Sequence, residues 1–169
     1  MGGESFQKTK SKVKESIEAF AHDLLKIYAE RSRAKSFIFS PPDDLFKDFE
    51  NKFPYIETPD QLRAIEQTIN DMCTGKTMDR IICGDVGFGK TEVALRATFL
   101  VVQSGKQVAI LVPTTLLAEQ HFQTFSSLLK DLPITVDLLT GSVKTKERKR
   151  IHANLLSGEL RILIGTHAL

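Results

Sequence analysis

The stretch Gly84-Asp85-Val86-Gly87-Phe88-Gly89-Lys90-Thr91 decides the fold class, because it fits the pattern GxxxxGK[ST]. A short apolar run at 80–83 precedes it, and a helical pattern over 90–104 follows it. Strand, glycine-rich loop and helix in this order are the context in which the pattern binds phosphate. The glycines let backbone N–H groups point inward, toward the positive end of the helix that opens near Lys90. We therefore expect a nucleoside triphosphate in this loop.

The residues of the loop have expected roles in holding ATP and Mg²⁺. Lys90 would neutralise oxygens of the β and γ phosphates, and the Thr91 hydroxyl would bind Mg²⁺. These two are the candidate catalytic residues, and Thr91 is also the candidate metal ligand. The remaining candidates for the phosphate cradle are Gly84, Asp85, Val86, Gly87, Phe88 and Gly89.

Downstream of the loop, strand patterns alternate with helix patterns. Apolar strand runs at 107–112, 134–139 and 160–164 are separated by helical patterns over 115–130 and 144–156. Together with the run at 80–83, they predict four strands of a parallel sheet that helices cover on both faces. The predicted fold class is α/β.

Upstream of the loop, the chain carries helix signals and a boundary. Neither Pro nor Gly occurs from 5 to 35, and apolar residues recur every three or four positions, which predicts a long amphipathic helix. Such a helix is either a connector to a partner or an ordinary solvated helix. The pair Pro41-Pro42 marks a boundary, and 45–53 resembles a short amphipathic helix. The sequence Thr58-Pro59-Asp60-Gln61 is a capping box with Pro at the first helical position, which predicts a helix from 59 to 73.

Composition narrows the functional classes. With 169 residues, 41% of them apolar and 26% charged, the chain has enough apolar side chains for one folded domain plus an appendage. No apolar run is long enough for a membrane span or a signal peptide, which predicts a cytoplasmic protein without a membrane partner. Cys73 and Cys83 lack metal-ligand spacing, so zinc and redox chemistry are not expected. A net charge of +2 permits a nucleic-acid partner without requiring one.

The acidic half of a hydrolytic site is missing from the pattern. ATP hydrolysis at such a loop needs an acidic residue at the end of a later strand, but the later strand runs end in Val112-Pro113, Leu139-Thr140 and Gly165-Thr166. We therefore expect ATP binding without turnover. A kinase, a GTPase and a non-catalytic nucleotide-binding module are the alternatives, but neither an acceptor lid nor the guanine-reading Asn-Lys-x-Asp occurs.

Three segments in one order and spacing carry a family resemblance: 84–94, 113–121 and 164–167. On them, the chain resembles the first, RecA-like motor domain of superfamily 2 DNA translocases, and among these the bacterial transcription-repair coupling factors. Leu139-Thr140-Gly141-Ser142 departs from that family's usual sequence and is more similar to RecG. A RecG-type branch-migration helicase is therefore the second reading.

The resemblance implies a domain division and a function. Residues 1–40 would be a linker helix, and residues 41–169 the N-terminal part of the first motor domain, ending before the Asp-Glu motif. The parent protein would be an ATP-driven translocase on double-stranded DNA that displaces stalled RNA polymerase and recruits excision repair. RNA polymerase and the repair proteins would contact other parts of that parent. The piece alone is expected to be inactive, because the Asp-Glu motif and the second motor domain are missing from it.

The resemblance also assigns individual residues. Gln61 would read the adenine edge, in addition to its capping role, and Phe53 would stack on the base. Thr114 and Thr115 would contact DNA phosphates or simply cap the next helix. His167 would make a DNA or interdomain contact, or be structural. The full set of candidate DNA contacts is Pro113, Thr114, Thr115, Gln120, Thr166 and His167.

Two further expectations concern surfaces. The run 144–150 holds five bases and one acid, and is either a phosphate-binding face or a solvated one. The resemblance further implies that strands 80–83 and 108–112 are not neighbours in the family's complete sheet. We expect their apolar edges either to pair with each other or to be covered by a second copy, because unpaired strand edges are costly.

Overall fold

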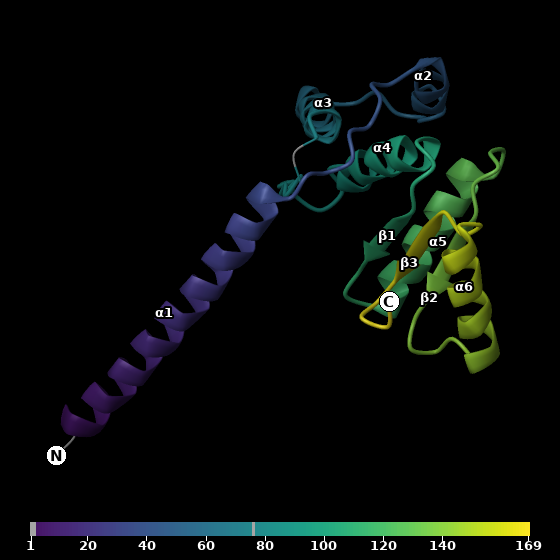
Figure 1. Ribbon diagram of the computed structural model, residues 1–169. Coiled ribbons are helices and arrows are strands. Elements are labelled where there is room, and N and C mark those ends of the chain that lie inside the picture. The colour runs from purple at the N-terminus through teal and green to yellow at the C-terminus, as the bar shows by residue number, and fades with distance from the viewer. Residues whose placement is uncertain (1–2, 76) are drawn as a thin grey trace.

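The computed structural model describes residues 3–75 and 77–169, which form a helix-covered sheet and one projecting helix (Figure 1). The elements run in the order α1 (Gly3–Arg33), α2 (Asp44–Glu50), α3 (Pro59–Cys73), α4 (Lys90–Gln103), β1 (Val108–Leu111), α5 (Thr115–Leu129), β2 (Val136–Leu139), α6 (Thr145–Ser157) and β3 (Ile162–Gly165).

The sheet is parallel and has the strand order β1-β3-β2. Val108 and Val136 both lie opposite Ile162 in the register, so β3 is the central strand. All four residues of β3 are buried, as expected for a strand with neighbours on both sides and helices on both faces. The α/β class with a parallel sheet is confirmed.

Successive residues of β3 point to opposite faces and enter two separate cores. Ile162 and Ile164 pack with side chains of α4 and α5 in the larger core, whereas Leu163 packs with Ile151 of α6 in the smaller one. Helices therefore cover both faces of the sheet, as the strand–helix alternation predicted. Stacked Phe49 and Phe99 rings, 4.1 Å apart, fix α2 on the outer side of α4.

The start of α3 follows the predicted capping box. The Thr58 hydroxyl accepts from the Gln61 backbone N–H at 3.3 Å, and the Gln61 side-chain oxygen accepts from the Thr58 N–H at 2.7 Å. Pro59 occupies the first turn, where its missing N–H leaves no bond unmade. The predicted helix bounds, 59 and 73, are those of the structure.

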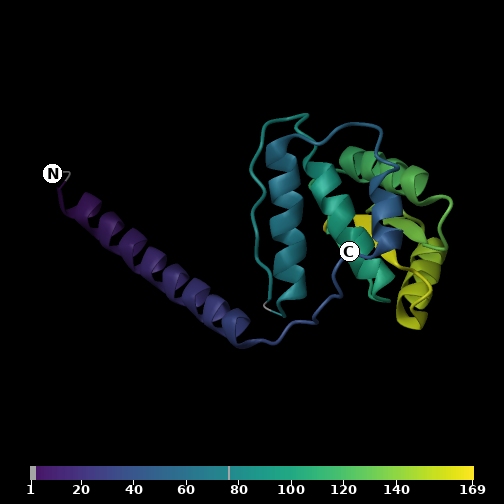
Figure 2. The same ribbon diagram turned by 90° about the horizontal axis from the view of Figure 1, so that it is seen from above.

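Helix α1 projects away from the body in both ribbon views (Figures 1 and 2). The apolar stripe that predicted this helix is solvent-exposed along its length, including Ile17 and Phe20. An ion pair between Arg31 and Asp79 joins the end of α1 to the segment after α3.

The predicted strand at 80–83 is wrong. Figure 2 shows the segment after α3 running back along that helix, and Arg80 holds it there through Asp71 at 2.6 Å and Gln67 at 2.9 Å. Ile81 is 85% exposed. A run of four residues forms a strand only beside a partner strand, and in the described part of the chain none pairs with it.

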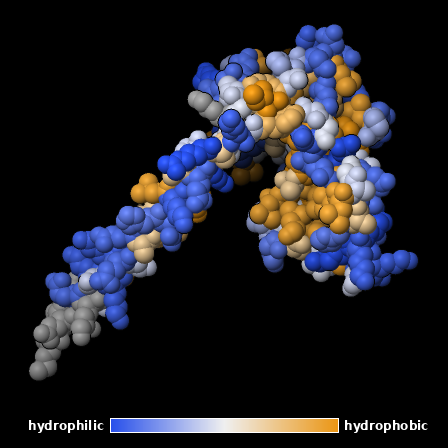
Figure 3. Space-filling view, in the orientation of Figure 1, coloured by the Kyte–Doolittle hydropathy of each residue, from blue (hydrophilic) through white to orange (hydrophobic). Residues whose placement is uncertain are grey.

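The expected pairing between 80–83 and 108–112 is also absent. Within residues 3–75 and 77–169, β1 pairs with β3 alone. Ala109 and Leu111 are its exposed positions, and an apolar surface lies in the part of the molecule where β1 runs (Figure 3). The outer edge of β1, whose unpaired backbone groups were expected to find a partner, therefore has no partner strand among the described residues.

Candidate nucleotide-binding site

The glycine-rich loop turns into α4 through two left-handed residues. Gly87 has φ +86° and Gly89, the N-cap of α4, has φ +71°. A side chain would strain the backbone at both positions. The first turn of α4 thus follows directly on the loop, as binding of phosphate at a helix N-terminus requires.

Lys90 folds over the loop that precedes it. Its ammonium group donates to the carbonyl oxygens of Gly84 at 2.5 Å and Asp85 at 2.6 Å. The side chain remains exposed, so it can leave these carbonyls for phosphate oxygens. Thr91 lies half-buried in the first turn of the same helix.

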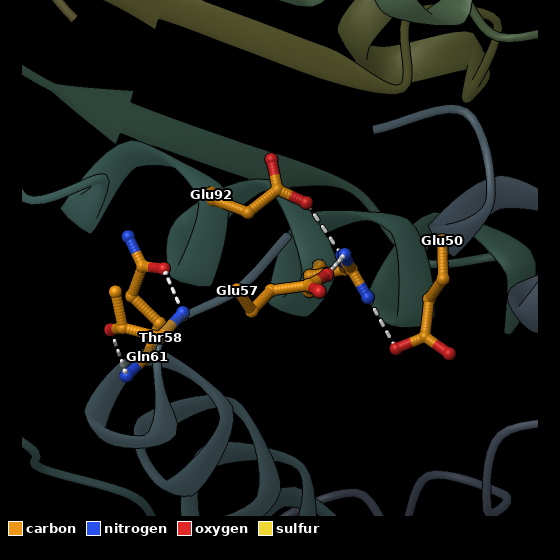
Figure 4. Close-up of polar contacts among 6 residues, drawn as sticks. Glu50, Glu57, Thr58, Gln61 and Glu92 are labelled. Carbon is orange, nitrogen blue, oxygen red and sulfur yellow. Dashed lines mark hydrogen bonds and ion pairs between the residues drawn. The ribbon is translucent and has the colours of Figure 1, made fainter. Parts of the chain in front are cut away.

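Gln61 connects the start of α3 with the loop. Its side-chain NH₂ donates to the Phe88 carbonyl at 2.7 Å. Its side-chain oxygen keeps the capping bond from the Thr58 N–H (Figure 4). A Cβ on Gly89 would come within 2.4 Å of the Gln61 side-chain nitrogen. The candidate adenine-reading residue therefore lies against the candidate phosphate loop.

A cavity of about 340 Å³ lies between these groups. Its lining combines the amide of Gln61 with the ammonium of Lys90, together with apolar atoms of Ile82, Phe88 and Val93. Concave sites with apolar walls and a few convergent polar groups are typical of ligand pockets. The cavity lining also includes Thr58, Asp60, Ala64, Cys83, Gly84 and Asp85.

Phe53 lies in a neighbouring cavity rather than in this one. That second cavity, of about 360 Å³, is lined by Phe53, Tyr55 and Arg96 among others. The Phe53 ring packs edge-on against Tyr55 with 5.5 Å between ring centres, and the Arg96 guanidinium carbon lies 5.9 Å from the Phe53 ring centre.

A buried charge cluster beside Phe53 was missed by sequence reasoning. Arg96 is 2% exposed and pairs with Glu50, Glu57 and Glu92. Burial raises the pKa of Glu92, and the hydrogen bond from Arg96 together with its positive charge opposes that rise. The signal was the spacing of Glu92 and Arg96, four residues apart on the apolar side of the helical pattern.

The candidate DNA contacts that follow β1 lie on the surface. Pro113, Thr114, Thr115 and Gln120 are all exposed. The Thr114 hydroxyl accepts from the Leu117 N–H at 3.3 Å, so Thr114 caps α5. The capping role is therefore present, and a hydroxyl oxygen with further acceptor capacity is left at the surface.

The candidates that follow β3 differ in exposure. Thr166 is 4% exposed and its N–H donates to the Leu139 carbonyl at 3.3 Å, whereas His167 is exposed. The structure brings the two motifs together, because β1 and β3 are parallel neighbours and their carboxyl ends share one edge.

Three comparisons with known proteins place the chain in a family. Residues 58–169 match the model of the DEAD/DEAH box helicase family. The chain belongs to this helicase family. That assignment covers the capping box, the glycine-rich loop and all three strands.

Curated relatives of this helicase chain are transcription-repair-coupling factors. Over all 169 residues it is 49% identical to the one from Haemophilus influenzae, 47% to that from Bacillus subtilis and 43% to that from Escherichia coli. The resemblance found in the sequence is confirmed. The chain spans only 15%, 14% and 15% of these relatives, respectively.

A solved structure has a similar fold. A structure of RecG bound to a three-way DNA junction matches 85% of this helicase chain, with a TM-score of 0.79 and 36% identity, and the match covers 20% of that chain. The RecA-like fold class is therefore confirmed. Among the described helices, none has both the length and the apolarity needed to cross a membrane.

Proposed function

We propose that this chain is the ATP-binding part of a double-stranded DNA translocase that displaces stalled RNA polymerase and couples transcription to excision repair. One observation carries the nucleotide part of the proposal: a single cavity is lined by both Gln61 and Lys90. These are the side chains expected at the base and at the phosphates, and they come from different helices. The similarity to coupling factors over the whole chain supports the rest.

The proposal divides the chain as its fold suggests. Residues 1–40 would link the motor to a preceding module, since α1 projects from the body. Residues 41–169 would be the first part of the motor domain. RNA polymerase and repair proteins would bind elsewhere on the parent protein, which would act in the cytoplasm, where its DNA lies.

ATP and Mg²⁺ fit the residues present. The backbone of 84–89 would cradle the phosphates, Lys90 would exchange its two loop carbonyls for phosphate oxygens, and Gln61 would face the adenine edge. Phe53 would reach the base from the neighbouring cavity. Thr91 would hold Mg²⁺, which supplies charge neutralisation for phosphoryl transfer when bound.

DNA would cross the edge of the sheet where β1 and β3 end. Pro113, Thr114, Thr115 and Gln120 are exposed there or nearby, and His167 is exposed after β3. Thr166 would act by holding the backbone of this motif, since its side chain is buried. Contacts of this kind position a duplex without reading its sequence.

These 169 residues would bind nucleotide without turning it over, because none of the described strands ends in an acidic residue. Titration calorimetry with ATP and ADP in the presence of Mg²⁺ tests this, together with a phosphate-release assay. We expect weak binding and no release. Lys90→Ala should weaken binding about tenfold or more, because a charge-assisted hydrogen bond contributes about 1.5–3 kcal/mol.

Lys130→Ala, an exposed lysine at the end of α5, is the matched control and should bind ATP normally. Hydrolysis of ATP that Lys90→Ala abolishes would contradict the absence of turnover. Equal binding by wild type and Lys90→Ala would contradict the site itself.

A RecG-type branch-migration helicase is the second candidate. The turn Thr140-Gly141-Ser142 favours it, and the two hydroxyls of that turn lie 2.8 Å apart. The identity to the RecG structure is 36% over 85% of the chain, below the 43–49% found with coupling factors over its full length. The coupling-factor reading is therefore the better supported.

A further inference from the structure

The cluster around Arg96 joins three segments next to the candidate nucleotide site, and Arg96, Glu50 and Glu57 line the neighbouring cavity that also holds Phe53. Its Nε donates to Glu92 at 2.6 Å, and Nη1 and Nη2 donate to Glu50 and Glu57, respectively. Glu50 ends α2, Glu57 precedes the cap of α3, and Glu92 lies in the first turn of α4. One guanidinium therefore binds one carboxylate from each segment (Figure 4).

The contribution of this cluster to stability does not explain its presence. Three carboxylates surround one buried guanidinium, and burial of charge is costly even when the charges are paired. Packed apolar side chains of similar volume would serve the core at least as well. The rigid, planar fork of arginine does fix relative positions and directions, which a flexible lysine or an apolar side chain does not.

The positions that the fork fixes are those of the candidate base-binding residues. Glu57 is directly followed by Thr58, whose capping box holds the Gln61 side chain against the Phe88 carbonyl. Arg96 itself lies 5.9 Å from the centre of the Phe53 ring. Through Glu92 the same arginine is tied to the turn of α4 that carries Lys90 and Thr91.

We propose that Arg96 is a positioning residue for base selectivity: it holds Phe53 and Gln61 at a fixed distance from the phosphate loop, so that adenine and triphosphate are bound together. The inference rests on the proposed nucleotide-binding function. It predicts that disturbing Arg96 affects recognition of the base and leaves recognition of the phosphates intact.

The test compares ligands that share phosphates but differ in the base. Dissociation constants of the 169-residue chain are measured for ATP, GTP and inorganic tripolyphosphate, all with Mg²⁺. Arg96→Lys keeps the charge and removes the fork. We expect Arg96→Lys to weaken ATP binding about tenfold, as for the loss of one buried charge-assisted hydrogen bond. The variant should also show a smaller preference for ATP over GTP. Its affinity for tripolyphosphate should stay unchanged.

Arg150→Lys is the matched control. Arg150 also pairs with two carboxylates, Glu147 at 2.6 Å and Asp137 at 2.8 Å, but these lie on α6 and β2. It should leave all three constants unchanged. Should Arg96→Lys fail to fold by circular dichroism, Glu57→Gln decides the matter, because Arg96 then keeps two carboxylates. We expect Glu57→Gln to lower the ratio of ATP affinity to tripolyphosphate affinity in the same direction as Arg96→Lys, but by a smaller factor.

Each remaining outcome overturns a defined claim. If the folded variant binds ATP and tripolyphosphate more weakly by the same factor, Arg96 is merely structural and the inference is overturned. Unchanged affinity for both ligands would also overturn it. Wild-type chain that binds neither ATP nor tripolyphosphate would overturn the proposed function and the inference with it.

Discussion

Gly87 and Gly89 share the left-handed backbone region but differ in their surroundings. A Cβ on Gly87 would meet nothing within 4 Å, whereas one on Gly89 would lie 2.4 Å from the Gln61 side-chain nitrogen. Gly87→Ala should therefore cost only the backbone strain, about 1–2 kcal/mol. Gly89→Ala should cost that strain and also displace the Gln61 amide from Phe88, for about 1 kcal/mol more. Urea unfolding of both variants measures the difference.

Equal losses of stability for the two alanine variants would contradict the close approach of Gln61. The ATP affinity of the two variants provides a second reading, since only Gly89→Ala moves a residue expected to read the base.

At this scale the sequence predicted residues whose chemistry is local. The capping role of Gln61 was predicted from a four-residue pattern and the role of Lys90 from an eight-residue loop pattern, whereas the adenine role of Gln61 came from the family resemblance. The structure brings Gln61 and Lys90 together. The Arg96 cluster was not predicted, because Glu50, Glu57 and Glu92 come from separate segments and their convergence depends on tertiary packing. The spacing of Glu92 and Arg96 indicates a pair on one helix, but it does not indicate that Glu50 and Glu57 join them.

The elements differ in how far local sequence determines them. Helix α3 has its predicted bounds because its first turn is closed by a cap and a proline within four residues. The run 80–83 was predicted as a strand from its apolar residues alone, but a strand needs a partner from elsewhere in the chain. The segment instead pairs through Arg80 with α3. Its misassignment follows from that non-local requirement.

The start of α6 carries the basic run 144–150. Not all of its positive charges are free to bind DNA phosphates. The hydrogen bonds that Arg150 donates to Glu147 and to Asp137 raise its pKa, so its charge is already paired. Replacing Lys144, Lys146 and Lys149 by Glu should weaken binding of unrelated DNA duplexes to the same degree and flatten the salt dependence, because phosphate contacts release counterions. Fluorescence anisotropy at several salt concentrations measures both.

The control for this change is the same charge reversal at Lys10, Lys12 and Lys14 of α1. It alters net charge equally, so it separates a local contact from a general electrostatic effect. If the α6 variant keeps the same DNA affinity and the same dependence of affinity on salt concentration, the run 144–150 is a solvated face that does not contact DNA.

The described part of the chain leaves apolar side chains in water at several places, and two of them are Leu111 in β1 and Ile81 in the segment after α3. The described part of the chain has a β1 edge without a partner and exposes Leu111 by 68% and Ile81 by 85%. Exposed apolar patches and open strand edges promote association. We expect the average mass in sedimentation equilibrium to rise with protein concentration, and Ile81→Lys combined with Leu111→Lys to reduce that rise.

Leu156→Lys is the control for association, because Leu156 is 91% exposed and lies on α6 rather than on β1 or in the segment after α3. Wild-type chain that stays monomeric at every concentration would show that neither site drives association.

The central claim is that the cavity between Gln61 and Lys90 holds the nucleotide. A nuclear magnetic resonance titration of ¹⁵N-labelled chain with Mg²⁺ and ADP tests it most directly, because it reports each amide separately. The account predicts saturable shifts of the backbone amides of 84–91 and of the Gln61 side-chain NH₂, with the amides of α6 unmoved. Shifts confined to residues outside 53–61 and 84–91, or no saturable shift at all, would contradict it.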